Sequence, residues 1–172
     1  LARSLELVAR GGAETFYRGE LAQQLLAFFQ AEGALFSADD FARQQAELYA
    51  PISTDYRGFT VYETAPPSQG FLLLEQLNII EGFDLAKLAP FSAERIHLLN
   101  EAKKLAFADR NRYAGDPAFV QWPLDRLISK SHAAERRAEI DPARVRSRND
   151  LVVEEHGGDT GYFAVADGDG NG

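Results

Sequence analysis

Apolar side chains recur at helical spacing in long stretches of the chain, which predicts a mostly helical fold. Between Ala13 and Ala31 they fall near one face of a single helix, and the Glu-Gly pair that follows ends it. Ser37, followed three residues later by Asp40, predicts a second, capped helix that Pro51 closes.

The pattern changes to β-branched and aromatic residues over 52–64, around the turn D-Y-R-G, which predicts a strand or hairpin. Pro66 and Pro67 then interrupt the chain, and a strongly apolar, buried helix is expected to follow and to end at Gly82.

Ser92 begins a further predicted helix, which continues to about Gly115. The remaining predicted elements are two short helices, a polar loop and a final strand, at Leu124–Leu127, Ala133–Ile140, 141–158 and Tyr162–Ala166. The pattern as a whole predicts an α+β chain dominated by helices.

The composition narrows the classes of partner. A net charge of -8 disfavours binding to a nucleic-acid backbone, and the one basic stretch, Arg136–Arg148, is interrupted by acids and is expected to be solvated. No apolar run approaches the roughly 20 residues of a membrane span. The absence of cysteine excludes disulfides, thiolate metal sites and cysteine nucleophiles, and leaves the cellular compartment open.

Two sets of polar residues were candidates for chemistry within the helical stretches. Three histidines lack metal-binding spacing, so they are poor candidates for catalysis or metal ligation. They are His97, His132 and His156. A charged stretch could clamp a substrate, although an ion-pair network at a helix end is the favoured interpretation. It contains Asp109, Arg110, Arg112 and Asp116.

The last residues of the chain contain a possible calcium motif. Asp167–Gly172 fits the first half of an EF-hand loop, D-x-D-x-N-G. An EF-hand also needs an entering helix and a glutamate at its twelfth position, whereas the preceding residues alternate like a strand. A β-turn is therefore favoured over a calcium site.

Thr160 is a possible nucleophile just before the predicted final strand. A threonine acts as a nucleophile when its own α-amine is free to serve as the base, which requires cleavage of the Asp159–Thr160 bond. The flanking glycines would give the backbone the freedom to bring this carbonyl to the hydroxyl. The local pattern alone also fits an ordinary loop.

Several segments, in order, resemble the γ-glutamyltranspeptidase family across nearly the whole chain. They are F-Y-R-G-E (16–20), P-I-S-T-D-Y-R-G-F-T-V-Y (51–62), P-P-S-Q-G (66–70), L-N-I-I-E-G-F-D-L (77–85), A-F-A-D-R-N-R-Y-A-G-D-P (106–117) and G-D-T-G-Y-F-A-V-A-D-G-D-G-N (158–171). The resemblance implies a fragment of an N-terminal-nucleophile (Ntn) hydrolase, an αββα sandwich. Residues 1–159 would be the C-terminal part of its large subunit, and 160–172 the start of the small subunit.

The resemblance also implies a reaction. Thr160 would attack the Asp159 carbonyl, and the freed threonine would take the γ-glutamyl group of glutathione or a related amide. Water, an amino acid or a peptide would accept that group, the two subunits would stay associated, and no metal or organic cofactor would be needed. The family's substrate-binding arginine lies upstream and its oxyanion-hole glycines downstream, so no substrate-binding residue is assigned.

This chain departs from the family at the junction. The family commonly has Thr-Thr-His there, whereas this chain has Thr160, Gly161 and Tyr162, and Asp159 replaces a familiar glutamine. Both features are similar to the hydrolase-like and acylase-like branches, so a glutaryl or cephalosporin acylase is the first alternative. A relative that has lost catalysis and serves assembly or binding is an alternative from another class.

Overall fold

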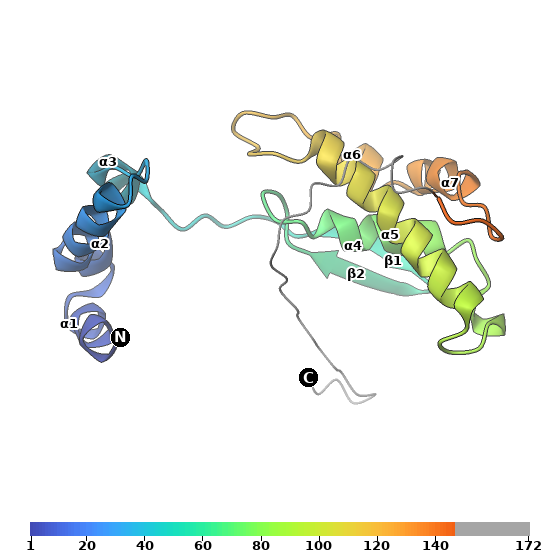
Figure 1. Ribbon diagram of the computed structural model, residues 1–172, viewed down its shortest axis with the longest axis horizontal. Coiled ribbons are helices and arrows are strands. Elements are labelled where there is room, and N and C mark those ends of the chain that lie inside the picture. Colours follow the sequence, from blue (N-terminus) through green and yellow to red (C-terminus); the bar gives the residue numbers. More distant parts are fainter. Residues whose placement is uncertain (147–172) are drawn as a thin grey trace. The chain divides into compact units, whose positions relative to one another are not determined.

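The computed structural model describes residues 1–146. The chain divides into two compact units, Leu1–Leu48 and Tyr49–Gly172. Figure 1 labels the helices and strands of both units. Among the described residues, no helix combines the length and the apolar character that crossing a bilayer requires.

The first unit is helical, but its helices differ from the predicted ones. Its elements are α1 (Ala2–Tyr17), α2 (Glu20–Ala31) and α3 (Ala38–Arg43). The prediction of a single helix over 13–31 is therefore wrong, because the helical conformation is interrupted between α1 and α2. A Cβ at Gly19 would lie 2.9 Å from Cα of Thr15, so glycine permits the close passage at this break.

The cap of α3 is confirmed, and its predicted end is wrong. Ser37 Oγ accepts a hydrogen bond from the Asp40 backbone N–H, and the Asp40 carboxylate accepts one from the Ser37 N–H. The helix ends at Arg43, well before Pro51. Residues 43–50 are exposed, so no packed face supports a short helix there.

The hairpin predicted over 52–64 is confirmed as β1 (Ile52–Tyr56) paired antiparallel with β2 (Phe59–Glu63). Its two-residue turn, Arg57 and Gly58, has positive φ at both positions, which matches the twist of the strands. The Arg57 N–H donates to Oε1 of Glu81, and this contact helps to hold a non-glycine residue in the left-handed region.

The helices of the second unit follow the predicted order. They are α4 (Phe71–Ile80), the short 3-10 helix η1 (Leu85–Lys87), α5 (Ala93–Tyr113), α6 (Leu124–Leu127) and α7 (Lys130–Ala138). Ser92 caps α5 as predicted, because its side chain accepts from the Arg95 N–H. The last helix begins three residues before the predicted start, where Ser129 is the cap.

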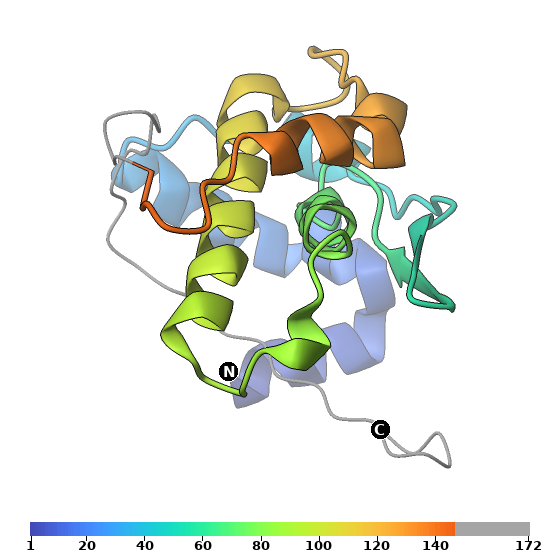
Figure 2. The same cartoon turned by 90° about the vertical axis from the view of Figure 1, so that its right-hand side faces the viewer.

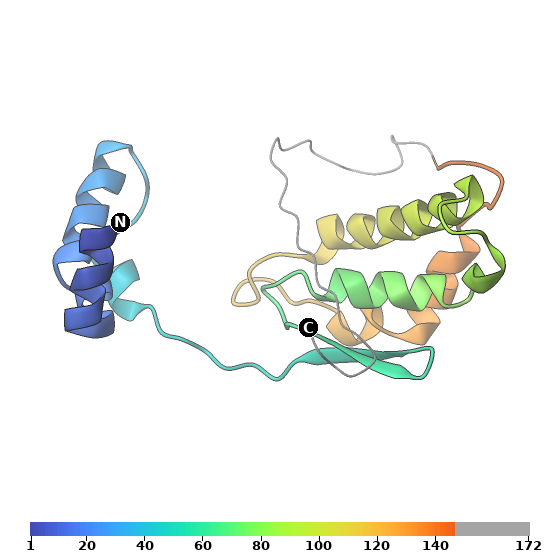
Figure 3. The same cartoon turned by 90° about the horizontal axis from the view of Figure 1, so that it is seen from below.

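Helix α4 is the centre of this unit. Figure 2 views it nearly end-on, with the hairpin on one side, α5 on the other and α7 across them. Figure 3 shows the same layers from below, with α5, α4 and the hairpin in succession. Seven of the ten residues of α4 are buried, so the helix has contacts on nearly every side.

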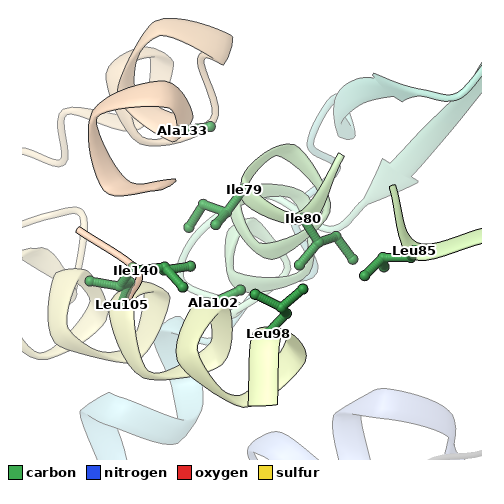
Figure 4. Close-up of a cluster of buried hydrophobic side chains, with 8 residues drawn as sticks. All are labelled: Ile79, Ile80, Leu85, Leu98, Ala102, Leu105, Ala133 and Ile140. Atoms are coloured by element: carbon green, nitrogen blue, oxygen red, sulfur yellow. The ribbon is translucent and has the colours of Figure 1, made fainter. Parts of the chain in front are cut away.

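Two clusters of buried apolar side chains hold the described part of this unit together. The larger one joins α4, η1, α5 and α7 with the residue that follows shortly after α7 (Figure 4). It consists of Ile79, Ile80, Leu85, Leu98, Ala102, Leu105, Ala133 and Ile140. The other consists of Phe71, Leu72, Ala106 and Leu127. Because α4 and α5 both contribute to each cluster, these two helices connect the two halves of the core.

Candidate functional site

The residues predicted to carry the chemistry lie outside the described part of the chain. These are Thr160 and the Asp159–Thr160 bond, together with Gly161 and Tyr162. The predicted final strand, the stretch Asp167–Gly172 and His156 lie there too. The described residues therefore bear on the scaffold that precedes the junction.

Three ionisable side chains are buried together where α4, α5 and α7 meet. Glu75 and Asp109 are 0 % exposed and His132 is 4 % exposed. Nε2 of His132 lies 2.8 Å from Oδ2 of Asp109 and 3.6 Å from Oε1 of Glu75. These three side chains, each from a different helix, are called the acid–histidine cluster.

Arg136 binds both carboxylate oxygens of Asp109. Its Nε donates to Oδ2 of Asp109 at 2.8 Å, and its Nη2 donates to Oδ1. His132 and Arg136 are four residues apart in α7, so they lie on one face of that helix. One face of α7 thus binds a single carboxylate on α5.

The two carboxyl groups have opposite pKa shifts. Burial, followed by hydrogen bonding and repulsion from Asp109, raises the pKa of Glu75 to about 9. Burial alone would raise the pKa of Asp109 too, but hydrogen bonds from Arg136, Glu75 and His132 hold it below its ordinary value. These surroundings therefore disfavour the charged form of Glu75 and favour the charged form of Asp109.

A second polar network connects α4 to the hairpin and to α7 through Asn78. Its Oδ1 accepts from Thr54 Oγ1 at 2.8 Å and from Lys130 Nζ at 2.6 Å. Its Nδ2 donates to the Ile128 carbonyl at 2.7 Å. Lys130 also pairs with Glu81 at 2.6 Å. Three of the four hydrogen-bonding positions of this buried amide are engaged, which fixes how these segments meet.

Arg137 binds the C-terminal end of α4. Its guanidinium donates to the carbonyls of Asn78 and Ile79, at 2.8 Å each. These are among the last carbonyls of a helix, where a cation is favourable. A Cβ at Gly82 would lie 2.0 Å from Cζ of Arg137, so glycine there leaves room for the side chain.

These contacts correct two predictions. Arg136 and Arg137 are not part of a solvated basic stretch, because both are half-buried and bind specific partners. Asp109 does belong to an ion-pair network, but its partners come from α7, 23 and 27 residues away, and not from its own helix end. Sequence spacing gave no signal of such a contact.

The other residues of the predicted clamp do not converge on Asp109. Arg110 lies over the Phe107 ring and Arg112 over the Tyr113 ring. Asp116 accepts a hydrogen bond from the Ala118 N–H. The described contacts of these three side chains are therefore local to the end of α5 and the loop after it.

The acid–histidine cluster also contains the atoms of a possible metal site. One ligand atom from each of Glu75, Asp109 and His132 lies within 4.8 Å of the others, and such donors suit Zn²⁺. Both oxygens of Asp109, however, already accept hydrogen bonds from Arg136. The guanidinium of Arg136 therefore already provides the positive charge that a metal ion would bring to Asp109.

A groove along α5 has a volume of about 500 Å³ and is a candidate binding surface of the second unit. Its polar side chains are engaged with the protein: His97 Nε2 lies 2.8 Å from the Asp141 carbonyl oxygen, and Lys104 pairs with Glu101 at 2.6 Å. Lys103 lies over the Phe107 ring. The described contacts leave few groups of this groove to recognise a ligand.

Comparison with known proteins identifies the family. The family model for γ-glutamyltranspeptidase matches residues 1–172. The chain belongs to the γ-glutamyltranspeptidase family.

Curated relatives of the γ-glutamyltranspeptidase family include both hydrolases and acylases. The chain is 42 % identical over 171 residues to the glutathione hydrolase-like YwrD proenzyme of Bacillus subtilis, covering 99 % of this chain and 32 % of that protein. It is 40 % identical over 171 residues to the acylase ACY 1 proenzyme of Pseudomonas sp. strain SE83, covering 99 % and 31 %. The chain thus spans about a third of the length of these relatives.

A solved structure of the family confirms the fold. The γ-glutamyltranspeptidase of Pseudomonas nitroreducens, in complex with L-DON, superposes with a TM-score of 0.79 at 35 % identity. The match covers 87 % of this chain and 46 % of that one. The predicted fold class, a mostly helical α+β fragment of an Ntn hydrolase, is confirmed by this similarity and by the described elements.

Proposed function

We propose that the chain is part of an autoprocessing amidohydrolase in which Thr160 is the nucleophile. The observation that carries the proposal is the match of the family to residues 1–172, which includes the junction. Both curated relatives above are named proenzymes, and each aligns with 99 % of this chain. That naming supports the maturation of an inactive precursor.

The proposed maturation is an acyl shift followed by hydrolysis. Oγ of Thr160 attacks the Asp159 carbonyl carbon, the amide C–N bond breaks, and the nitrogen takes up a proton. Water then hydrolyses the new ester, so that Asp159 gains a free carboxylate and Thr160 a free α-amine and a free hydroxyl. The amine has an ordinary pKa of about 7.7–8.0 and can take the hydroxyl proton in each later turnover.

The freed Thr160 then transfers an acyl group. It attacks the side-chain amide of a γ-glutamyl compound such as glutathione, releases the amine, and holds the γ-glutamyl group as an ester. Water, an amino acid or a peptide accepts that group and regenerates the hydroxyl. No step requires a metal or an organic cofactor.

This proposal assigns the two parts of the chain different roles. Residues 1–159 end the large subunit, and residues 160–172 begin the small subunit, which remains associated with it. The helices and the hairpin of the second unit form a scaffold. Residues 1–172 alone are expected to be inactive, since they are about a third of the length of the relatives.

An acylase is the second candidate, and two observations favour it. The chain is 40 % identical to an acylase proenzyme, close to its 42 % identity to a glutathione hydrolase-like proenzyme. Gly161 and Tyr162 also stand where the family commonly has threonine and histidine. The substrate would then be a glutaryl or related amide, and the Thr160 chemistry would be unchanged.

Mass spectrometry of the full-length protein tests the processing step. The wild type should yield two pieces separated at Asp159–Thr160, and Thr160→Ala should remain one chain. Thr60→Ala, at an exposed hairpin position, is the matched control and should be cleaved like the wild type. An intact wild-type chain with full activity would contradict the proposal.

Substrate assays on the processed protein separate the candidates. Hydrolysis of γ-glutamyl anilides supports the hydrolase, and preference for glutaryl amides supports the acylase. A processed or unprocessed protein that turns over neither would instead indicate a relative used for assembly or binding.

A further inference from the structure

The carboxyl group of Glu75 lacks a donor among the described residues. The side chain is 0 % exposed, and neither of its oxygens accepts a hydrogen bond from a described residue. A buried carboxylate without donors is costly, because it loses its hydration and gains nothing in exchange. The ionised form of Glu75 is therefore poorly accommodated in this position.

Asp109, in contrast to Glu75, is surrounded by hydrogen-bond donors. Its two oxygens accept from Arg136, and Oδ2 also lies 2.8 Å from Nε2 of His132. Of the two carboxyl groups in the acid–histidine cluster, only Asp109 therefore has donors that stabilise a negative charge. The charge of Arg136 balances that of Asp109. In the described part of the chain, no further arginine or lysine is then paired with a second carboxylate, Glu75, in this cluster.

His132 fits this arrangement as a donor to Asp109. Because ionised Asp109 can only accept, the hydrogen lies on Nε2 of His132 and points to Asp109. Nδ1 of His132 has no hydrogen-bond partner among the described residues. The nearest carboxylate to Nδ1 is the exposed Glu135, at 3.7 Å.

We propose that Glu75 is a protonated carboxylic acid that donates a hydrogen bond to Asp109, so that a single proton links α4 to α5 and is lost at alkaline pH. Protonation turns the Glu75 carboxyl group into a hydrogen-bond donor. Asp109 then accepts a hydrogen bond from Glu75 in addition to those from Arg136 and His132. With Glu75 protonated, Arg136 balances the charge of the one remaining carboxylate, Asp109. The titratable and charged groups that face Glu75 are Asp109 on α5, and His132 and Arg136 on α7.

The proposal has a definite pH signature. The pKa of Glu75 is raised from 4.5 to about 9, so the folded protein holds a proton that the unfolded chain releases above about pH 4.5. The resulting stabilisation is complete below pH 4.5 and declines up to about pH 9. Within this window, the unfolding equilibrium constant should rise by up to about tenfold per pH unit.

Glu75→Gln tests the protonation state because glutamine is a neutral isostere with a donor. Unfolding of the 172-residue chain by urea can be followed through Trp122, the only tryptophan, whose ring contacts Phe71 of α4. The variant should be at least as stable as the wild type at pH 7 and should lack the decline toward pH 9. Equal pH slopes in the two proteins would overturn the proposal.

Infrared spectroscopy gives a readout that does not depend on stability. The wild type at pH 7 should show the carbonyl stretch of one protonated carboxylic acid, which disappears near pH 9 and is missing from Glu75→Gln. If both proteins have identical spectra in this region, Glu75 is ionised and the proposal fails. Glu135→Gln is the matched control, because Glu135 is exposed, and it should keep the band.

A metal titration distinguishes the proton from a cation at the same side chains. Addition of Zn²⁺ after treatment with a chelator should leave the urea midpoint of the wild type unchanged. A rise in the midpoint that Glu75→Gln abolishes would replace the proton with a metal site and overturn the proposal.

Discussion

Nε2 of His132 lies 2.8 Å from Oδ2 of Asp109, which joins α7 to α5 inside the core. The same carboxylate receives Arg136 from one turn further along α7. Asp109 thus holds two side chains of one helix and also faces Glu75 on α4. A single carboxylate therefore connects the three longest described helices of the second unit.

Replacing Asp109 with asparagine should strongly destabilise the second unit. Arg136, only 20 % exposed in its side chain, would lose its carboxylate and remain largely buried as an uncompensated charge. Loss of one partner of such a pair costs roughly 3–5 kcal/mol of unfolding free energy. Urea unfolding followed by Trp122 fluorescence measures this change.

Asp84→Asn is the matched control for this substitution. Asp84 pairs with Lys87 at 2.7 Å, but both side chains are more than half exposed. Exposed ion pairs contribute about 0–1 kcal/mol, so the control should unfold nearly like the wild type. Similar effects of the two substitutions would show that burial of the Asp109 pair has no energetic consequence.

Acid should destabilise the second unit through Asp109. Its pKa in the folded protein is below the ordinary 3.8, so its contribution is present above pH 3.8 and is lost as the pH falls through the lowered value. The urea midpoint should therefore fall steeply below about pH 4. Glu75→Gln should keep this acid limb, because Glu75 is already protonated there.

A midpoint that stays constant from about pH 5 to about pH 2 would contradict the role given to Asp109. Glu81 also has a lowered pKa, because it accepts hydrogen bonds from Lys130 and the Arg57 N–H. The variant Glu81→Gln therefore separates its contribution to the acid dependence from that of Asp109. That variant should lose part of the acid dependence only.

Leu105→Ala should create a cavity in the larger apolar cluster. Leu105 is 1 % exposed and packs among residues from α4, α5 and α7, so its loss should cost about 2–5 kcal/mol. Leu99→Ala, on the same helix but 40 % exposed, should cost much less. Differential scanning calorimetry would detect the difference as a lower Tm for Leu105→Ala. Equal Tm values would contradict the described packing of α5.

The elements that the sequence predicted well have local causes. Helix α5 begins at Ser92 because its hydroxyl caps the first turn, and the Arg57–Gly58 turn pairs the two strands at the expected position. Each depends on residues only a few positions apart. The family resemblance, carried by ordered motifs, was confirmed over the whole chain.

The errors arose where distant packing decides the outcome. The apolar pattern over 13–31 continues across Gly19, so it could not reveal the break between α1 and α2. The sequence makes His132 a poor candidate because no H-x-x-H or H-E-x-x-H spacing links it to another histidine. Its partner Asp109 is 23 residues away, and only the packing of α5 against α7 brings them together.

The spacing of His132 and Arg136 has a consequence for how this chain tolerates changes in length. Inserting or deleting one residue between them would rotate one side chain by about 100° around the helix, away from Asp109. The loop after α5, where Phe119 is 87 % exposed, carries no comparable constraint. Related chains are therefore expected to gain and lose residues in that loop, and to keep the length of α7 unchanged.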